Sequence, residues 1–263
     1  MIDPGTRTPA DLFDLSGRVA LVTGGAQGFG RAFSHYLAGA GADIAVVDIN
    51  AAGAEAAAGE IRAIGRRAIG IEVDVKDAVS VRTAVDRTVA ELGGLDILVN
   101  NAGINTGNDT RPEVLDPSVW DLVIKTNLTG YFLFCQAAWP PLQRSTGGRI
   151  INVASAAAAR VPRLPGRHTT SYTVSKAAVV SLTRCLGLEW AKDGICVNSI
   201  SPTYSNTGLI KRDPVILQTM IDSSPFARLG ESSDLMGVLL FLASSASEFT
   251  TGQDFLVDGG YSI

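Results

Sequence analysis

The fold is decided by an apolar run that leads directly into a glycine-rich turn, Val19-Ala20-Leu21-Val22 followed by Thr23-Gly24-Gly25-Ala26-Gln27-Gly28-Phe29-Gly30. A helical pattern continues over residues 31–37. A strand, a turn and a helix N-terminus in this order form an anion site, because free backbone N–H groups and the helix dipole face a pyrophosphate. A glycine-rich turn is often only a turn, but the strand before it and the helix after it favour dinucleotide binding.

Three glycines of this turn have separate uses. Gly24 permits the tight turn, Gly28 lets the backbone approach the phosphates, and Gly30 allows close packing of the helix. Their spacing is G-x-x-x-G-x-G, which differs from the more familiar G-x-G-x-x-G. The turn therefore predicts a dinucleotide-binding unit with a variant glycine pattern.

An acidic side chain ends the second apolar run. Asp48 follows Ile44-Ala45-Val46-Val47 and stands eighteen positions after Gly30. A carboxylate at this place can bind both ribose hydroxyls of an adenosine, and it repels a 2′-phosphate. The alternative is that Asp48 only starts a turn into Asn50. Because the next basic residue is Arg62, we predict NAD rather than NADP.

Strand-like and helix-like runs alternate along the 263 residues without a linker or a break in composition. This alternation predicts one α/β domain, doubly wound, with helices on both faces of a seven-stranded parallel sheet. Several of the runs are nearly unbroken in Val, Ile and Leu, as is typical of parallel strands that are covered on both faces. The seven expected strands are residues 18–23, 43–48, 68–73, 95–100, 149–154, 195–200 and 254–257.

The composition excludes several classes of partner. The net charge is −4, and no run of Lys or Arg is present, so nucleic acid is not an expected partner. No apolar stretch is long enough to span a bilayer, so a membrane partner is not expected either. Residues 1–15 lack the apolar core of a signal peptide and are interpreted as a flexible N-terminal arm, which leaves residues 16–263 as the catalytic domain.

The cysteines and histidines are few. Cys135, Cys185 and Cys196 are widely spaced in apolar contexts, so we expect three buried thiols in a reducing cytoplasm. His35 and His168 are the only histidines, so no metal site is predicted.

Tyr172 and Lys176 lie four residues apart in the string Ser171-Tyr172-Thr173-Val174-Ser175-Lys176. Residues at this spacing share one face of a helix. An unperturbed Tyr has a pKa near ~10, and a neighbouring positive charge lowers it toward neutral pH, where the phenol becomes a useful proton shuttle. Many surface helices carry such a pair by chance, so the pair gains meaning only beside the glycine turn.

A long connection follows the sixth expected strand. Residues 201–229 contain Pro202, Pro214 and Pro225 and only short helical stretches. A connection of this length in a compact domain is usually a lid or a substrate loop, and the alternative is an ordered excursion with no role. We predict a substrate loop over the carboxyl ends of the strands.

With these residues in place, the chain resembles the short-chain dehydrogenase/reductase family over residues 15–261. The resemblance implies a Rossmann-type sheet, a nicotinamide cofactor, reversible oxidation of an alcohol, and a homotetramer. It rests on motifs in the order of the family: residues 23–30, Asp74, Asn100-Asn101-Ala102-Gly103, Asn127, Ser155, Tyr172 with Lys176, residues 202–207, and Val257-Asp258-Gly259-Gly260.

The resemblance implies four catalytic residues. Tyr172 would exchange a proton with the substrate oxygen, and Ser155 would hydrogen-bond that same oxygen. Lys176 would lower the pKa of Tyr172 and hold the nicotinamide ribose. Asn127, in an expected helix over residues 118–142, would help hold a water in a proton relay to Lys176.

The resemblance also implies a set of cofactor contacts. Asp74 and Val75 would contact the adenine, and Asn101 would lie near the adenosine ribose. Without the other motifs, Asn101 and Asn127 would each be interpreted as a turn or helix cap. The full set is Gly24, Gln27, Gly28, Phe29, Gly30, Asp48, Asp74, Val75, Asn101, Gly103, Tyr172, Lys176, Pro202, Ser205 and Thr207.

The chain departs from the family pattern at three places. Seventeen positions separate Ser155 from Tyr172, about four more than is usual, and the extra residues fall in 160–168, an expected bulge at the mouth of the pocket. The three Arg and one His of this insertion either contact a polar substrate or are solvated. Thr203 stands where the family usually has Gly, and Phe29 stands where a small aliphatic residue is common.

Two strings, residues 198–209 and 250–261, are similar to mannitol, sorbose and arabinitol-type members of the family. Asn206, Ser205, Arg163 and His168 would supply donors and acceptors for several hydroxyls, whereas a fatty pocket would be lined by apolar side chains. The sequence therefore predicts a polyol or its ketose as the substrate. The alternative is that these polar groups face water and the similarity reflects ancestry only.

Two other functions compete with an NAD-dependent alcohol dehydrogenase. A 3-oxoacyl-thioester reductase usually prefers NADPH, which Asp48 disfavours. A catalytically silent scaffold that senses nucleotides has no need of an intact set of Asn127, Ser155, Tyr172 and Lys176.

Overall fold

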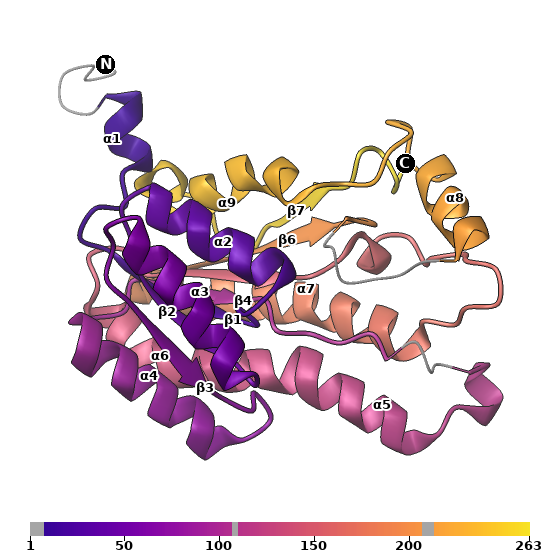
Figure 1. Cartoon of the computed structure of the whole chain (residues 1–263), viewed down its shortest axis with the longest axis horizontal. Coiled ribbons are helices and arrows are strands. Elements are labelled where there is room, and N and C mark those ends of the chain that lie inside the picture. Colours follow the sequence, from indigo (N-terminus) through magenta and orange to yellow (C-terminus); the bar gives the residue numbers. More distant parts are fainter. Residues whose placement is uncertain (1–7, 107–109, 207–212) are drawn as a thin grey trace.

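A computed structural model describes residues 8–106, 110–206 and 213–263 of the chain (Figure 1). Seven parallel strands form one sheet in the order β3-β2-β1-β4-β5-β6-β7, so the predicted fold class is confirmed. The strands are β1 (Val19–Thr23), β2 (Asp43–Asp48), β3 (Ala68–Glu72), β4 (Ile97–Asn100), β5 (Arg149–Val153), β6 (Cys196–Pro202) and β7 (Asp254–Val257).

Helices cover both faces of this sheet. The α-helices are α1 (Pro9–Phe13), α2 (Gly28–Gly39), α3 (Ala51–Ala63), α4 (Ala78–Leu92), α5 (Pro117–Ile124), α6 (Gly130–Arg144), α7 (Thr170–Trp190), α8 (Pro214–Asp222) and α9 (Met236–Ala243). Short helical turns are η1 (Pro112–Val114), η2 (Lys125–Thr129), η3 (Ala156–Ala158), η4 (Ala191–Asp193), η5 (Ser232–Leu235) and η6 (Ser245–Ser247).

The alternation of side chains along each strand builds two separate cores. Ala20 and Val22 of β1 pack with residues of α2, α3 and α9 on one face, whereas Val19 and Leu21 pack with residues of α4, α6 and α7 on the other (Figure 1). Successive side chains of a strand point to opposite faces, so a sheet covered twice needs apolar residues at consecutive positions. The unbroken Val, Ile and Leu runs follow from this requirement.

The helix expected over residues 118–142 is interrupted. It consists of α5, the π-helical turn η2, and α6, which continues through Pro140 and Pro141 to Arg144. A π-helical turn adds a residue to the helical repeat and changes which side chains face inward. Thr126 and Asn127 are buried within this turn.

The packed domain begins before residue 16, the boundary that the sequence suggested. Leu15 is only 1% exposed, and its N–H donates to the carbonyl of Ala40. Ahead of it, Thr8 caps α1 by accepting a hydrogen bond from the N–H of Asp11. Part of the expected arm therefore belongs to the core.

The expectation of three buried thiols is wrong for Cys185, which is exposed on α7, and holds only in part for Cys196, which is half-buried. Cys135 is buried, and its burial raises the pKa of the thiol to about 12. Among the described residues, no helix combines the length and apolarity needed to cross a membrane.

Candidate active site

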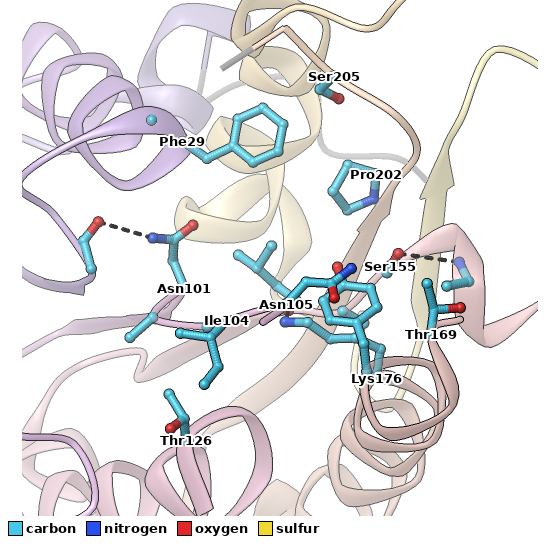
Figure 2. Close-up of a pocket in the computed structure, with 18 of the residues that line it drawn as sticks. Phe29, Asn101, Ile104, Asn105, Thr126, Ser155, Thr169, Lys176, Pro202 and Ser205 are labelled. Carbon is cyan, nitrogen blue, oxygen red and sulfur yellow. Dashed lines mark hydrogen bonds between the residues drawn. The ribbon is translucent and has the colours of Figure 1, made fainter. Parts of the chain in front are cut away.

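A cavity of about 730 Å³ opens at the carboxyl ends of the strands (Figure 2). One part, here called the glycine-turn half, is lined by Gly24, Gln27, Gly28, Phe29, Asp48, Ile49, Asp74, Val75, Lys76 and Asn101. The other part, the insertion half, is lined by Pro162, Leu164, Thr169, Tyr204, Met220 and Tyr261. Ser155, Tyr172 and Lys176 also line the cavity, so the structure brings the two predicted motifs into one site.

The glycine turn has the backbone that its sequence predicted. Gly24 and Gly28 have φ values of 64° and 53°, in the left-handed region that favours glycine. A Cβ on Gly30 would lie 2.1 Å from the carbonyl oxygen of Gly24, so no other residue fits there without moving the turn. Gly30 itself does not line the cavity and acts through this packing.

Asn101 holds the glycine turn in place. Its side-chain amide donates to the carbonyls of Thr23 and Gly24, at 2.9 and 3.2 Å, and its backbone N–H donates to the hydroxyl of Thr23 (Figure 2). These bonds connect the end of β4 to the end of β1. Asn101 is therefore a clamp for the turn as well as a lining residue.

Asp48 combines the two roles that the sequence left open. One carboxylate oxygen accepts from the N–H of Asn50, which starts the expected turn, and the other accepts from the N–H of Ala26 in the glycine turn, both at 3.0 Å. The carboxylate therefore has a fixed orientation beside the cavity. A glycine turn at the N-terminus of a helix, with a fixed acid next to it, suits a dinucleotide.

The remaining cofactor predictions are placed as follows. Gln27, Phe29, Asp74, Val75, Gly103, Pro202 and Ser205 all line the cavity, and Thr207 lies outside the described residues. Lys76, which the sequence analysis missed, pairs with Asp74 at 2.9 Å. Phe29 fits in place of a smaller residue because its ring stacks on that of Phe33, with centroids 5.7 Å apart.

Tyr172 and Lys176 lie on α7, and the Lys176 Nζ lies 5.9 Å from the centre of the Tyr172 ring. Ser155 hydrogen-bonds the side chain of Tyr172 across the gap between β5 and α7. Two hydroxyls that are seventeen positions apart in the sequence therefore lie together at the cavity. This arrangement can hold a single substrate oxygen and exchange a proton with it.

The pKa values differ from the sequence-based expectation. Burial raises the pKa of the Tyr172 phenol above its ordinary value, and the hydrogen bond from Ser155 opposes this rise. Burial also lowers the pKa of Lys176 to about 7. A low-dielectric site disfavours both charged forms, and the expected lowering by Lys176 is not among the causes that act on Tyr172.

Tyr131 is a neighbour of Lys176 that the sequence analysis missed. The Lys176 ammonium donates to the carbonyl of Val153 at 2.7 Å and to the Tyr131 hydroxyl at 3.3 Å. The Tyr131 hydroxyl in turn donates to the same carbonyl at 3.1 Å. A signal existed, because Tyr131 stands four positions after Asn127 on a segment expected to be helical.

Asn127 is fully buried and does not line the cavity. Its side chain accepts from the N–H of Ile104 at 2.8 Å and donates to the Ile104 carbonyl and to the Ser175 hydroxyl. A Cβ on Gly103 would lie 3.3 Å from the Asn127 Oδ1 and 3.5 Å from the Lys176 Nζ. Asn127 thus secures the segment after β4 close to Lys176, and its part in a proton relay stays a prediction.

The insertion reaches the cavity with its apolar residues. Pro162 and Leu164 line the cavity, whereas Arg163 and His168 are exposed and do not. Asn206 is also exposed and bonds to Glu231. Of the four polar groups expected to contact a polyol, only Ser205 lines the cavity, and its hydroxyl donates to the Thr203 carbonyl at 2.9 Å.

Other polar groups stand near the Ser155 and Tyr172 hydroxyls. Asn105 and Thr169 line the cavity, and Figure 2 shows both in the part of it that contains Ser155 and Lys176. Met220 of α8 also reaches the cavity, which places part of the segment 201–229 at the site, as predicted. Thr203, in place of the usual Gly, lines the cavity as well.

Comparison with known proteins gives a consistent result. The family model described as enoyl-(acyl carrier protein) reductase matches residues 24–262. The chain is 38% identical to 2-dehydro-3-deoxy-D-gluconate 5-dehydrogenase of Escherichia coli K12, covering 95% of this chain and 97% of that protein. It is also 38% identical to cyclohexanol dehydrogenase of Rhodococcus sp. TK6, covering 95% and 98%. A crystal structure of a short-chain type dehydrogenase/reductase from Mycobacterium marinum superposes with a TM-score of 0.90 at 37% identity, covering 96% and 98%.

Proposed function

The chain belongs to the short-chain dehydrogenase/reductase family, and we propose that it interconverts a secondary alcohol and its ketone with NAD as cofactor. The observation that carries this proposal is the meeting of the Ser155 and Tyr172 hydroxyls in the cavity that the glycine turn enters. The names of the relatives, which include dehydrogenases of a sugar acid and of cyclohexanol, support a secondary alcohol.

Ser155 and Tyr172 have separate roles in the proposed reaction. NAD, when bound, would supply the acceptor for the hydride that leaves the carbinol carbon. Ser155 donates a hydrogen bond to the substrate oxygen and orients the alcohol, and the Tyr172 oxygen takes the hydroxyl proton. In the reverse direction Tyr172 returns the proton to the carbonyl oxygen.

Lys176 supplies a positive charge close to the Tyr172 phenol. With a pKa of about 7, its amine is partly protonated at neutral pH, and the protonated form favours the phenolate that proton abstraction leaves on Tyr172. Asn127 would complete the path by which the proton reaches solvent through Lys176.

The preference for NAD rests on Asp48. Its carboxylate is held by the N–H groups of Ala26 and Asn50, so it cannot easily turn away from a 2′-phosphate. The adjacent Ile49 is apolar and exposed and offers no positive charge to such a phosphate. Charge repulsion therefore favours NAD.

For the substrate, we favour a polyol or its ketose. The similarity of residues 198–209 and 250–261 to polyol-type members supports this choice, as does the sugar-acid dehydrogenase among the relatives. A second candidate is a cyclic secondary alcohol, because Pro162 and Leu164 give the cavity an apolar side that suits a ring.

The test is a screen of NAD and NADP reduction with sugar alcohols, cyclohexanol and other secondary alcohols, hydroxysteroids and 3-hydroxyacyl thioesters. We expect the highest kcat/KM with NAD and a secondary alcohol. A preference for NADP with a 3-hydroxyacyl thioester would replace this proposal with a 3-oxoacyl-thioester reductase. Nucleotide binding without turnover of any alcohol would favour the silent scaffold.

We also propose a cytoplasmic homotetramer with no nucleic-acid or membrane partner. Leu188 on α7 is 81% exposed, and Leu256 on the edge strand β7 is 45% exposed. An edge strand and an apolar helix surface are both suited to contact another copy. Light scattering on the purified protein measures the assembly, and a monomeric mass at micromolar concentration would contradict it.

A further inference from the structure

The insertion half of the cavity contains a pair of tyrosines to which the proposed reaction gives no role. Tyr204 follows β6, and Tyr261 follows β7, and both line the cavity. Their rings meet edge to face, with centroids 5.4 Å apart and an interplanar angle of 77°. Tyr261 is only 4% exposed, so this pair is part of the packed structure.

Arg160, the first residue of the insertion, secures the pair. Its guanidinium lies 5.0 Å from the centre of the Tyr261 ring, and its Nη1 donates to the Tyr261 carbonyl. A cation over a ring and a hydrogen bond to the same residue fix both the position and the tilt of that ring. The insertion and the segment after β7 are thereby joined beside the cavity.

Both tyrosines line the cavity, and their side chains are linked to each other. A side-chain hydrogen bond links Tyr204 to Tyr261, and Tyr172 lines the same cavity. Burial and the bond to Tyr261 raise the pKa of Tyr204, so the hydroxyl stays neutral at working pH. Two linked hydroxyls use one proton for the bond between them and keep a second proton to donate.

We propose that the Tyr204–Tyr261 pair binds a second oxygen atom of the substrate while Ser155 and Tyr172 bind the reacting one. This inference rests on the proposed function. The substrate class that follows is a secondary alcohol carrying a further hydroxyl or carboxylate, with its carbon skeleton against Pro162 and Leu164.

A site with polar groups at two places discriminates against a substrate that satisfies only one. An alcohol without the second oxygen would leave the phenol pair desolvated and without a substrate partner, which costs binding in the transition state. We therefore expect trans-cyclohexane-1,2-diol to be a better substrate than cyclohexanol, although the rings are the same size.

The test measures kcat/KM for the diol and for cyclohexanol in the wild type and in Tyr204→Phe and Tyr261→Phe, which keep both rings. We expect the ratio of the two kcat/KM values to fall by ~10- to 100-fold in either variant, as for loss of a directional hydrogen bond. Tyr36→Phe is the matched control, because the Tyr36 hydroxyl contacts Ser232 at 3.2 Å and does not line the cavity.

Equal losses on both substrates, or a wild type that prefers cyclohexanol, would overturn the inference. Absence of NAD reduction with every alcohol of the screen, the diol included, would instead overturn the proposed function. 4-Hydroxycyclohexanecarboxylate distinguishes the two kinds of second oxygen: a kcat/KM above that of the diol, lowered in Tyr204→Phe and Tyr261→Phe, identifies a carboxylate. A higher value for the diol identifies a hydroxyl.

Discussion

The glycine-turn half of the cavity is held mainly by hydrogen bonds to backbone groups, whereas the insertion half is held mainly by contacts between side chains. Asn101 bonds to the carbonyls of Thr23 and Gly24, and Asp48 accepts from two backbone N–H groups. The insertion half is held by contacts between side chains, which are the Tyr204 and Tyr261 rings and the Arg160 guanidinium. A site built from backbone tolerates few substitutions, while a site built from side chains can change specificity by single substitutions.

The two halves of the cavity meet at Tyr172 and Lys176, so substitutions there should have the largest effect on turnover. Tyr172→Phe removes only the hydroxyl that we propose exchanges the proton, so turnover should fall by ~10²- to 10⁴-fold. The dissociation constant for NAD should change little, because the glycine turn is untouched. Steady-state kinetics and a fluorescence titration with NADH measure the two quantities separately. Near wild-type turnover would remove Tyr172 from its role.

The backbone character of the glycine-turn half is tested by Gly30→Ala. The new Cβ would meet the Gly24 carbonyl at 2.1 Å and displace the turn, so NAD binding should weaken by roughly 10- to 100-fold. Gly39→Ala at the other end of α2 is the control, because its Cβ would meet nothing within 4 Å. If both variants bind NAD equally well, the turn does not depend on this contact.

Asp48 is the side chain that we propose sets cofactor selectivity in this half. Asp48→Ala combined with Ile49→Arg should change the NAD to NADP ratio of kcat/KM by on the order of 10- to 100-fold toward NADP, because a like charge is replaced by an opposite one. Ile49→Arg alone should change it less, since the carboxylate remains. A wild type that already works better with NADP would show that Asp48 does not act by repulsion.

Substitution of Lys176 measures how much burying a cation between the two halves of the cavity lowers the free energy of unfolding. Its partners, the Val153 carbonyl and the Tyr131 hydroxyl, are uncharged, and burial lowers its pKa from 10.5 to about 7. Lys176→Met should abolish turnover yet raise the free energy of unfolding at pH 7 by about 1–4 kcal/mol, because a buried cation is replaced by an apolar side chain. The Val153 carbonyl keeps its bond from Tyr131.

The lowered pKa of Lys176 also determines how the stability of the wild type changes with pH. Between pH 7 and 10.5 the unfolded state binds more protons than the folded one, so the wild type gains stability as pH rises. The advantage of Lys176→Met should therefore be largest below pH 7 and shrink toward pH 10. Urea unfolding at both pH values measures it, with the exposed Lys192→Met as the control. If Lys176→Met and the wild type differ by the same free energy of unfolding at both pH values, burial of Lys176 does not destabilise the protein.

The sequence predicted the glycine-turn half well because local rules govern it. The positive φ of Gly24 and the close approach at Gly30 follow from neighbours in the chain. Tyr131 and Tyr261 were not assigned to the site, because their contacts with Lys176 and Arg160 depend on how distant segments pack. No sequence pattern marked the π-helical turn η2, so the helix expected there was drawn as continuous.

The predicted direction of the Tyr172 pKa shift was wrong for a different reason. The sequence places a positive charge beside the phenol but does not reveal that Lys176 is buried and Tyr172 is half-buried. Burial then reverses the direction of the shift for Tyr172 and removes much of the charge on Lys176 at neutral pH. The chemical roles were predicted from residue types, whereas the energetics required the structure.

The strand order also constrains how the molecule folds in time. β1 pairs with β2 through a short crossover, whereas its other neighbour, β4, arrives much later in the chain, with Ala20 opposite Ile97. Contacts that are closer in sequence close smaller loops and form sooner. We expect β1, β2 and β3 to gain protection first in pulsed hydrogen exchange, and β6 and β7 last. Simultaneous protection of all seven strands would contradict this order. A chain that emerges from the ribosome would then complete its nucleotide cradle before Tyr261 has been synthesised.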